Sequence, residues 1–431
     1  MLNFIKKNIS VSEKENWLQS PFFAIYLGGL VFLFIIMFVF GWRPLQLNHA
    51  KLFVPTITRG IGGSDYHFFY YAGWRARLHK NFYFVNPAEP NPNELSEAFY
   101  IVQFVYPPLM AYFFVPFSLF PFNVSLLIYS MFTILLFFWS IYILGKFVRK
   151  KWFYFVVAAL IFLFSPFFLL HLDHGQTNMP VMVLISVCLL FYIKKKYKIA
   201  GFLLALSIMF KLMPVIFLPY FFIKNRKVFY SALITCAIFL LLFGFNMTTD
   251  FMAAVSGFGG GSINAGGWST SLGGLFYNRF TYDYISLSQA QKVVMALIVI
   301  ISGAFYFLTY RMNKIIKSDA DNNLILLEFG TLMFFVSFFP SVSALHNGLY
   351  YLFVFTAYWN LRPNLPIIYD YLLQALFYLS MSQGLLFPIL GNQPYMTLFA
   401  FMSFEMFIIV ILLWYCYFKQ VNKQINTPQI I

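Results

Sequence analysis

Long apolar segments, separated by short polar intervals, recur along the 431 residues of the chain. The longest run through residues 21–41, 123–144, 228–245, 292–310 and 395–417. About 20 apolar residues in helical conformation span the hydrocarbon core of a bilayer. In lipid, a helix also satisfies its own backbone hydrogen bonds. The pattern therefore predicts an all-α polytopic membrane protein.

Further apolar segments form predicted hairpins that cross the membrane and return. A short polar interval separates the members of each pair, which are 153–171 with 178–193, 324–340 with 349–361, and 366–388 with 395–417. The interval 199–223 fits two short helices that meet near Lys211 and Pro214, because proline removes a backbone donor and interrupts a helix.

The apolar run 104–121 differs from the others because it contains prolines at positions 107, 108, 116 and 121. Each proline removes a backbone donor, and the carbonyl groups left unpaired are costly in lipid. We therefore predict a re-entrant or interfacial element here and place the true crossing at 123–144.

Basic residues mark the predicted cytoplasmic side. The chain has a net charge of +15, and most of its 29 Lys and Arg residues lie between apolar segments, in clusters at 6–14, 146–151, 194–198, 224–227 and 311–317. Such clusters stay in the cytoplasm during insertion. Crossings that alternate between them give about 12 spans, with both termini inside.

This topology describes a single integral membrane domain, residues 1–431, with a first external loop at 42–103 and a second long one at 246–291. The composition agrees, because 61% of the residues are hydrophobic and only 10% are charged, whereas soluble proteins carry about 25% charged residues. The basic clusters are explained by topology, so the expected partner is the lipid bilayer and no nucleic acid is expected.

The sequence contains no GKS or GKT phosphate loop, no HExxH and no GxSxG. The glycine-rich stretch GFGGGSINAGGW, residues 257–268, lacks the strand and helix of a dinucleotide site. It is predicted to be an external loop, either gating or simply disordered. The three cysteines lie within apolar segments and predict neither a disulfide nor a metal site.

Asp65 is a lone acid in the first external loop, within GIGGSDYHFFYY. An acid in an external loop often has no function. Here, however, the preceding glycines allow close approach of the backbone, and the aromatic segment that follows is predicted to form an interfacial amphipathic helix. An acid held at the water–lipid boundary can act as a general base. Asp65 is thus either an ordinary loop acid or a catalytic base.

The short motif HGQTN, residues 174–178, lies at a predicted external turn between two helices. Thr177 or Asn178 there can simply cap a helix. Together, His174, Gln176 and Asn178 are also a dense group of hydrogen-bonding side chains, of the kind that bind sugar hydroxyls and phosphate oxygens. Both interpretations remain open at this stage.

Lys211 interrupts an apolar run in IMFKLMP, where a lysine is costly unless it has an anionic partner or a function. It either extends to the interface or binds phosphate on the external side. His346, in SVSALHNGLYY, lies at another predicted external turn. It is either structural or a contact for phosphate or acceptor.

Two further features on the predicted external side are candidates for substrate binding. Arg59, Arg75 and Arg77 are external basic residues that either bind an anionic headgroup or lie on the lipid surface. Tyr106, before two prolines, either marks a helix start or forms an aromatic wall for a lipid-linked substrate.

Four segments in order resemble one known family: GGSDYHFFYYAGW, FVYPPLMAYFFVPFSLFP, HGQTNMPVMVLI and AGFLLALSIMFKLMPVIFLPYFFIKNRK. Across roughly residues 20–360 the chain is similar to glycosyltransferase family 87, whose members are polyprenol-phosphate-sugar-dependent transferases of the GT-C superfamily, often mannosyltransferases. The resemblance implies a GT-C-type helical bundle with interfacial helices in its first external loop.

The resemblance also implies an active site on the extracytoplasmic face of a bacterial inner membrane. The donor would be a sugar on a polyprenyl phosphate, and the acceptor a lipid or glycan. Asp65 would be the general base for an inverting transfer. Lys211, His346 and nearby polar groups would stabilise the leaving phosphate. No cofactor or metal is expected.

Two other classes compete with a transferase. A transporter or flippase of lipid-linked sugars would show internal repeats and charged residues along a path through the membrane, and neither pattern is evident. A polysaccharide polymerase would carry large arginine-rich external loops, whereas the loop 246–291 contains only Arg279.

Overall fold

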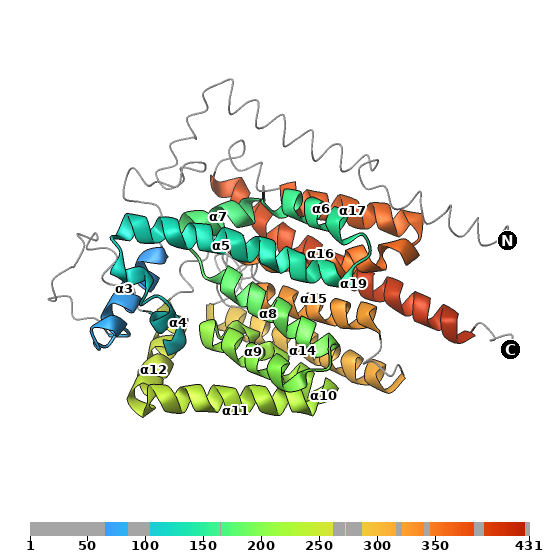
Figure 1. The fold of residues 1–431 in the computed structure, drawn as a ribbon. Coiled ribbons are helices and arrows are strands. Elements are labelled where there is room, and N and C mark those ends of the chain that lie inside the picture. The colour runs from blue at the N-terminus through green and yellow to red at the C-terminus, as the bar shows by residue number, and fades with distance from the viewer. Residues whose placement is uncertain are drawn as a thin grey trace, which may run out of the picture.

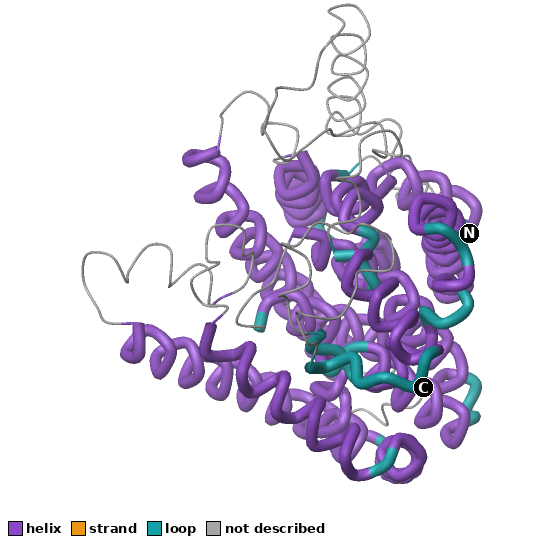
Figure 2. The backbone as a smooth tube through the Cα atoms, turned by 90° about the vertical axis from the view of Figure 1, so that its left-hand side faces the viewer, coloured by secondary structure: helices purple, strands orange, loops and turns teal. Residues whose placement is uncertain are grey.

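The computed structural model describes residues 65–84, 104–163, 165–261, 272, 287–315, 321–339, 345–382 and 392–426. Within these ranges the chain forms helices and connecting loops and contains no strand (Figure 2). The prediction of an all-α protein is therefore confirmed. The predicted first span, 21–41, lies outside the described residues.

The N-terminal half of the bundle contains helices of very different length. Their bounds are α3 (Tyr66–Arg77), α4 (Pro108–Phe113), η3 (Phe117–Leu119), α5 (Phe122–Leu144), η4 (Gly145–Phe147), α6 (Lys151–Leu163), α7 (Pro166–His174), α8 (Asn178–Ile193), α9 (Tyr197–Phe210), η5 (Met213–Ile216) and α10 (Phe217–Lys224).

The C-terminal half continues the bundle with longer helices. Their bounds are α11 (Arg226–Phe243), α12 (Phe245–Gly261), α14 (Leu287–Ile315), α15 (Asn322–Phe338), η8 (Leu345–Tyr350), α16 (Tyr351–Leu361), η9 (Arg362–Asn364), α17 (Ile367–Ser382) and α19 (Asn392–Asn426).

Within the described ranges, four segments are long and apolar enough to cross a membrane: 122–147, 226–243, 291–315 and 403–422. Several shorter apolar helices accompany them, so the chain is a helical membrane protein. The count of about 12 spans stays a prediction. Figure 1 shows the helices running mostly lengthwise through the bundle, with α3, α4 and α12 gathered at its left-hand end.

Helix α5 has the exposed and buried faces expected of a helix that contacts lipid. It has 23 residues and begins directly after Pro121. Leu127, Met131, Leu135 and Trp139 recur every four residues and are all exposed, so they lie along one stripe of the helix. The opposite side buries Tyr129 and other residues in the bundle. A helix that is apolar on both its buried and its exposed faces is suited to a bilayer.

The proline-rich segment forms no long helix. It contains only α4, six residues long, and η3, three residues long. Helix α3 packs directly on it, because a Cβ atom on Gly73 would lie 2.5 Å from the carbonyl carbon of Phe114. Buried aromatic residues of both segments, among them Tyr66, Phe69 and Phe114, form a core separate from that of the main bundle.

Two predicted elements differ from those observed. The single helix expected over 153–171 is divided into α6 and α7, because Pro166 cannot continue a helix and Ser165 caps the new one by accepting from the Phe168 N–H. The segment 246–291, expected as a loop, begins within helix α12. Phe251 of α12 packs with the core around α3, which stabilises that helix.

The predicted pair of short helices over 199–223 is confirmed as α9, η5 and α10. The main core surrounds α15 and α16, and α15 is buried from Leu324 to Phe338. Close packing of these two helices depends on Gly330, where a Cβ atom would lie 3.2 Å from the Phe353 carbonyl oxygen. A helix buried on all sides is apolar around most of its circumference, and the buried carboxylate of α15, Glu328, is paired with Lys224.

Candidate active site

Asp65 is fixed at the start of α3 by the turn between α7 and α8. Its backbone N–H donates to the His174 carbonyl over 3.2 Å. The next residue of the turn, Gly175, has a φ of 62° and lies against Tyr66, where an added Cβ atom would come within 2.6 Å of the Tyr66 Cβ. Only glycine allows both this left-handed conformation and this close approach.

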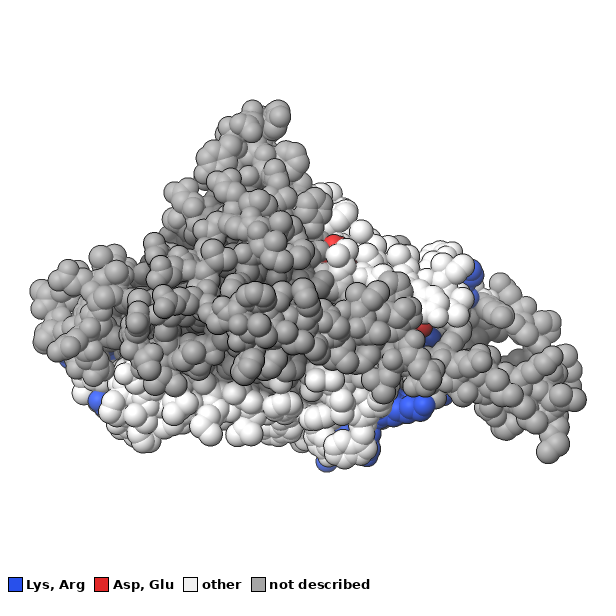
Figure 3. Space-filling model, turned by 90° about the horizontal axis from the view of Figure 1, so that it is seen from above, with Lys and Arg blue, Asp and Glu red and all other residues white. Residues whose placement is uncertain are grey.

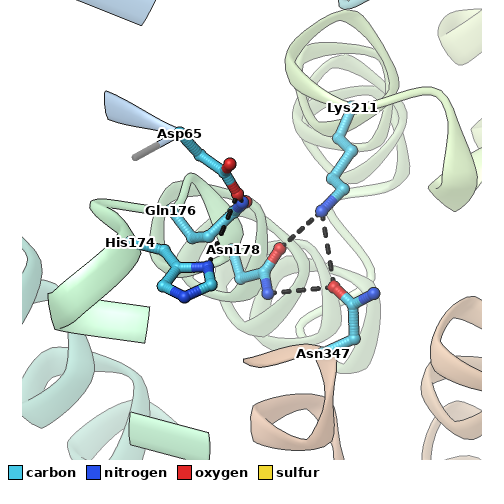
Figure 4. A network of polar contacts seen from close by, with 6 residues as sticks. All are labelled: Asp65, His174, Gln176, Asn178, Lys211 and Asn347. Carbon is cyan, nitrogen blue, oxygen red and sulfur yellow. Dashed lines mark hydrogen bonds and ion pairs between the residues drawn. The ribbon is translucent and has the colours of Figure 1, made fainter. Parts of the chain in front are cut away.

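The Asp65 carboxylate is not used to cap its helix. Asp65 occupies the N-cap position of α3, yet its side chain accepts no capping hydrogen bond, which is the usual role of an aspartate there. Instead Oδ2 accepts from Gln176 Nε2 and lies 3.8 Å from His174 Nδ1 (Figure 4). The side chain is 31% exposed, so a substrate hydroxyl can reach it.

Lys211 lies at the other side of the same turn, between α9 and η5. Its backbone is extended, with φ −151° and ψ 126°, where α9 ends before Pro214. The buried Nζ donates to Asn178 Oδ1 over 2.7 Å and to Asn347 Oδ1 over 3.4 Å (Figure 4). Both acceptors are neutral amides, so they orient the ammonium group without neutralising it.

The two asparagines are themselves held in place. Asn178, the first residue of α8, donates from Nδ2 to Asn347 Oδ1 over 3.0 Å. Its Oδ1 also accepts from the Tyr350 hydroxyl over 3.1 Å. The turn is fixed from a third helix, because the Tyr129 hydroxyl of α5 donates to the Gln176 carbonyl over 2.7 Å. Side chains from four separate segments thus form one polar network.

Electrostatics connect Asp65 with the rest of this network. Burial lowers the pKa of Lys211, which lies outside the helices on either side of it, to about 8, and the charge of Asp65 opposes this shift. Burial also raises the pKa of the Tyr106 phenol, and Asp65 adds to that shift. Carboxylate, ammonium and phenol therefore share one electrostatic environment.

The structure brings together most of the residues singled out in the sequence: Asp65, His174, Gln176, Asn178 and Lys211 all lie in Figure 4. Tyr106 lies close enough to Asp65 to feel its charge, and its ring packs edge-on against Phe69.

Two predicted site residues are not placed. Arg59 lies outside the described residues. The backbone of His346 belongs to η8, but its side chain lies outside the described part of the chain. The other arginines predicted to be external donate to backbone carbonyls, Arg75 to that of Asn81 and Arg77 to that of Ser118.

Asn347, Tyr350 and His171 belong to this region but were not predicted. Asn347 follows His346 directly, so the prediction at His346 was the sequence signal that could have indicated Asn347. Tyr350 and His171 resemble many other buried residues in an aromatic-rich chain, and only their tertiary neighbours distinguish them. Among the described residues, no group of three or more His, Cys, Asp or Glu side chains is placed to hold a metal ion.

A comparison with curated proteins finds no match. The model of glycosyltransferase family 87 matches residues 104–340, which is more than half of the chain. This match contains the α7–α8 turn and Lys211, whereas Asp65 precedes it. The matched segment thus contains Lys211 and one of its two amide partners, Asn178, within a helical membrane protein. The chain belongs to glycosyltransferase family 87.

Proposed function

We propose that this membrane glycosyltransferase transfers mannose from a polyprenyl-phosphate donor to a hydroxyl of a lipid or glycan acceptor. The observation that carries the proposal is the buried Lys211 ammonium, which forms no ion pair within the described residues yet faces the same polar network as Asp65. A buried cation of this kind calls for an anion. A phosphate ester supplies one.

Asp65 acts as the general base. Its Oδ2 is engaged by Gln176, whereas its Oδ1 has no hydrogen-bond partner among the described residues. Oδ1 can therefore accept the proton of the acceptor hydroxyl as the hydroxyl oxygen attacks the anomeric carbon of the sugar. The new glycosidic bond forms on the face opposite the phosphate, so the anomeric configuration inverts.

Lys211 stabilises the leaving group. As the bond between the anomeric carbon and the phosphate oxygen breaks, the electron pair stays with the polyprenyl phosphate. An ammonium group has three donors, and Asn178 and Asn347 take two of them. The third can bind the phosphate where its charge grows, which favours the transition state over the bound donor.

The distribution of positive charge supports a site on the external face of the membrane. Several cations at the ends of helices lie over aromatic rings near their predicted cytoplasmic ends, such as Lys146 over Tyr142 at 4.6 Å and Lys314 over Tyr310 at 4.5 Å. Figure 3 shows the larger groups of visible Lys and Arg in the right-hand half of the molecule, away from α3. Positive charge is retained in the cytoplasm, so Asp65 faces outward.

The test is transfer of radiolabelled mannose from polyprenyl-phosphate mannose to a membrane lipid extract, with the full-length protein in lipid nanodiscs. Asp65→Asn keeps the shape of the side chain but removes the base, so we expect the rate to fall by about 10²–10⁴-fold. Asp250→Asn is the matched control, because Asp250 is another external carboxylate that binds Asn81 over 2.7 Å.

Each outcome has a distinct meaning. Normal transfer by Asp250→Asn together with loss in Asp65→Asn supports the proposal. Transfer by Asp65→Asn at the wild-type rate would show that Asp65 is not the base. If wild type moves no mannose, the same assay with glucosyl and arabinosyl donors decides whether the sugar alone was wrong.

A further inference from the structure

Polar groups at the α7–α8 turn remain unused by the network around Lys211. His171 is 1% exposed, and neither of its ring nitrogens has a hydrogen-bond partner among the described residues. The same holds, within the described ranges, for Gln176 Oε1 and Thr177 Oγ1, in residues that are 3% and 0% exposed. Buried polar atoms normally have partners, so a group of them at one turn requires an explanation.

Ordinary structural roles do not account for these atoms. Thr177 occupies the N-cap position of α8 but makes no capping hydrogen bond, although capping is what a threonine usually does there. The Gln176 side-chain N–H donates to Asp65, and the side-chain carbonyl oxygen of Gln176 takes no part in that bond. The His171 backbone carbonyl accepts from the Gln176 N–H over 3.1 Å, while its imidazole contributes nothing to the turn.

His171 lies beside the groups that the proposed reaction uses. It is three residues before His174 in α7, so the two imidazoles share one face of that helix. The α7 helix is nine residues long and is not among the four segments that are long and apolar enough to cross a membrane. Burial lowers the pKa of His171 to about 3, and the charges of Lys211 and His174 act in the same direction. Its imidazole is therefore neutral, with one donor and one acceptor.

We propose that His171, Gln176 and Thr177 form the subsite for the transferred sugar and that this subsite selects an uncharged, hydroxyl-rich sugar. The inference rests on the proposed function and concerns the same site. The neutral imidazole and the threonine hydroxyl can donate, and the Gln176 carbonyl can accept, which matches hydroxyl groups that both donate and accept. Gln176 donates to Asp65 and the charge of Lys211 acts on His171, so the subsite adjoins both the proposed base and the proposed phosphate-binding cation.

Charged sugars fit this subsite poorly. Its own groups, an imidazole, a hydroxyl and an amide oxygen, are uncharged and supply no counter-ion. Burying a charge that lacks a partner is costly. A site built to hydrogen-bond hydroxyl groups discriminates strongly against a sugar that leaves the buried polar groups of the site unpaired.

Binding of tritiated lipids to the full-length protein in nanodiscs tests the subsite separately from catalysis. The probes are undecaprenyl phosphate and the same lipid carrying mannose, glucose or 4-amino-4-deoxyarabinose. Wild type should bind a neutral glycolipid more tightly than the bare phosphate, and the amino sugar lipid no more tightly. His171→Phe and Thr177→Val should each weaken neutral glycolipid binding by about tenfold and change binding of the bare phosphate less than twofold.

Further variants separate the subsite from general damage. Lys211→Met should weaken binding of every probe, His171→Gln should recover part of the lost affinity, and His79→Phe, at an exposed histidine, should bind like wild type. Thr177→Val is nearly isosteric, so it tests the subsite if His171→Phe fails to fold. Equal losses for glycolipid and bare phosphate in both subsite variants, or no loss, would overturn the subsite. Absence of all binding to wild type would overturn the proposed function as well.

Discussion

At the scale of single residues, Lys211 shows how a membrane protein keeps a buried charge. Lys211 is 6% exposed, and its Nζ is held by two amide oxygens rather than by a carboxylate within hydrogen-bonding distance. Amides fix the position of the ammonium but leave its charge available. Pairing it directly with Asp65 would have neutralised both groups that the proposed reaction needs.

The lowered pKa of Lys211 predicts a pH dependence. Below about pH 8 the side chain is protonated and can bind phosphate, whereas above this value it becomes neutral. We expect kcat/KM for the polyprenyl-phosphate sugar to fall by about tenfold per pH unit above pH 8. Initial transfer rates measured across the pH range check this.

A matched variant identifies the group that titrates. Lys211→Arg retains its charge at high pH, because guanidinium has a pKa above about 12. Whatever its absolute rate, this variant should show no fall between about pH 8 and pH 10. A wild-type profile that stays flat over the same interval would rule out Lys211 as the phosphate-binding cation.

At the scale of elements, the turn between α7 and α8 positions the site. Pro166 separates α7 from α6, and the short α7 brings His174 and Gln176 to Asp65. Gly175 ends α7 in the left-handed conformation and lets α3 approach. One turn therefore sets the position of the proposed base, Asp65, and of Asn178, the first residue of α8, which holds Lys211.

We expect Gly175→Ala to disturb the site more than the fold. A methyl group there would force Tyr66 away, since the Cβ–Cβ distance would be 2.6 Å. The left-handed φ of 62° adds about 1–2 kcal/mol of strain. Transfer activity should fall by at least about tenfold, with a smaller loss of thermal stability. Both are measurable on the purified protein.

Gly244→Ala provides the matched control. Gly244 also has a positive φ, 83°, but a Cβ atom there would meet nothing within 4 Å. This variant carries backbone strain at least as large, because a φ of 83° with a ψ of 161° is a conformation that almost only glycine adopts. It displaces no neighbour, so it should retain activity. Equal activity losses in the two variants would mean that strain, and not the approach of α3, explains the effect.

At the scale of the whole molecule, a buried ion pair ties the helices together at the end opposite the site. Lys224 Nζ of α10 lies 2.7 Å from Glu328 Oε1 of α15, and their side chains are 1% and 0% exposed. The Tyr220 hydroxyl donates to Glu328 Oε2 over 2.9 Å. Opposite charges removed from water in this way must remain together.

Removing one partner should destabilise the bundle strongly. Lys224→Met leaves the Glu328 carboxylate buried without its cation, at a cost of about 3 kcal/mol or more. We expect a lower thermal unfolding midpoint, and a double variant with Glu328→Leu should recover most of the loss because both charges are gone. Lys227→Met, at an exposed cation nearby, should unfold like wild type.

The same variants separate stability from catalysis. Below its unfolding temperature, the double variant should transfer sugar at the wild-type rate, since its residues lie away from Asp65 and Lys211. A double variant as unstable as Lys224→Met would show that the pair stabilises through its shape and not through its charges.

Much of the architecture follows from sequence pattern alone. Apolar runs of membrane-spanning length and basic clusters between them determine a helical membrane protein, because lipid accepts only backbones that satisfy their own hydrogen bonds. Two residues out of place in this pattern, Asp65 and Lys211, also pointed to the polar network where we propose that the chemistry takes place. Pro107 and its neighbours correctly marked 104–121 as lacking a long helix.

Other features depend on contacts that no local pattern contains. The break before Pro166 was missed because the apolar run continues through it, and helix α12 was missed because Phe251 becomes buried only when α3 packs beside it. Asn347 became part of the Lys211 network because two distant turns meet. Sequence determines which side chains prefer lipid, water or helix, since these preferences are local. Only the tertiary structure decides which polar atoms find partners, since those partners lie far apart in the chain.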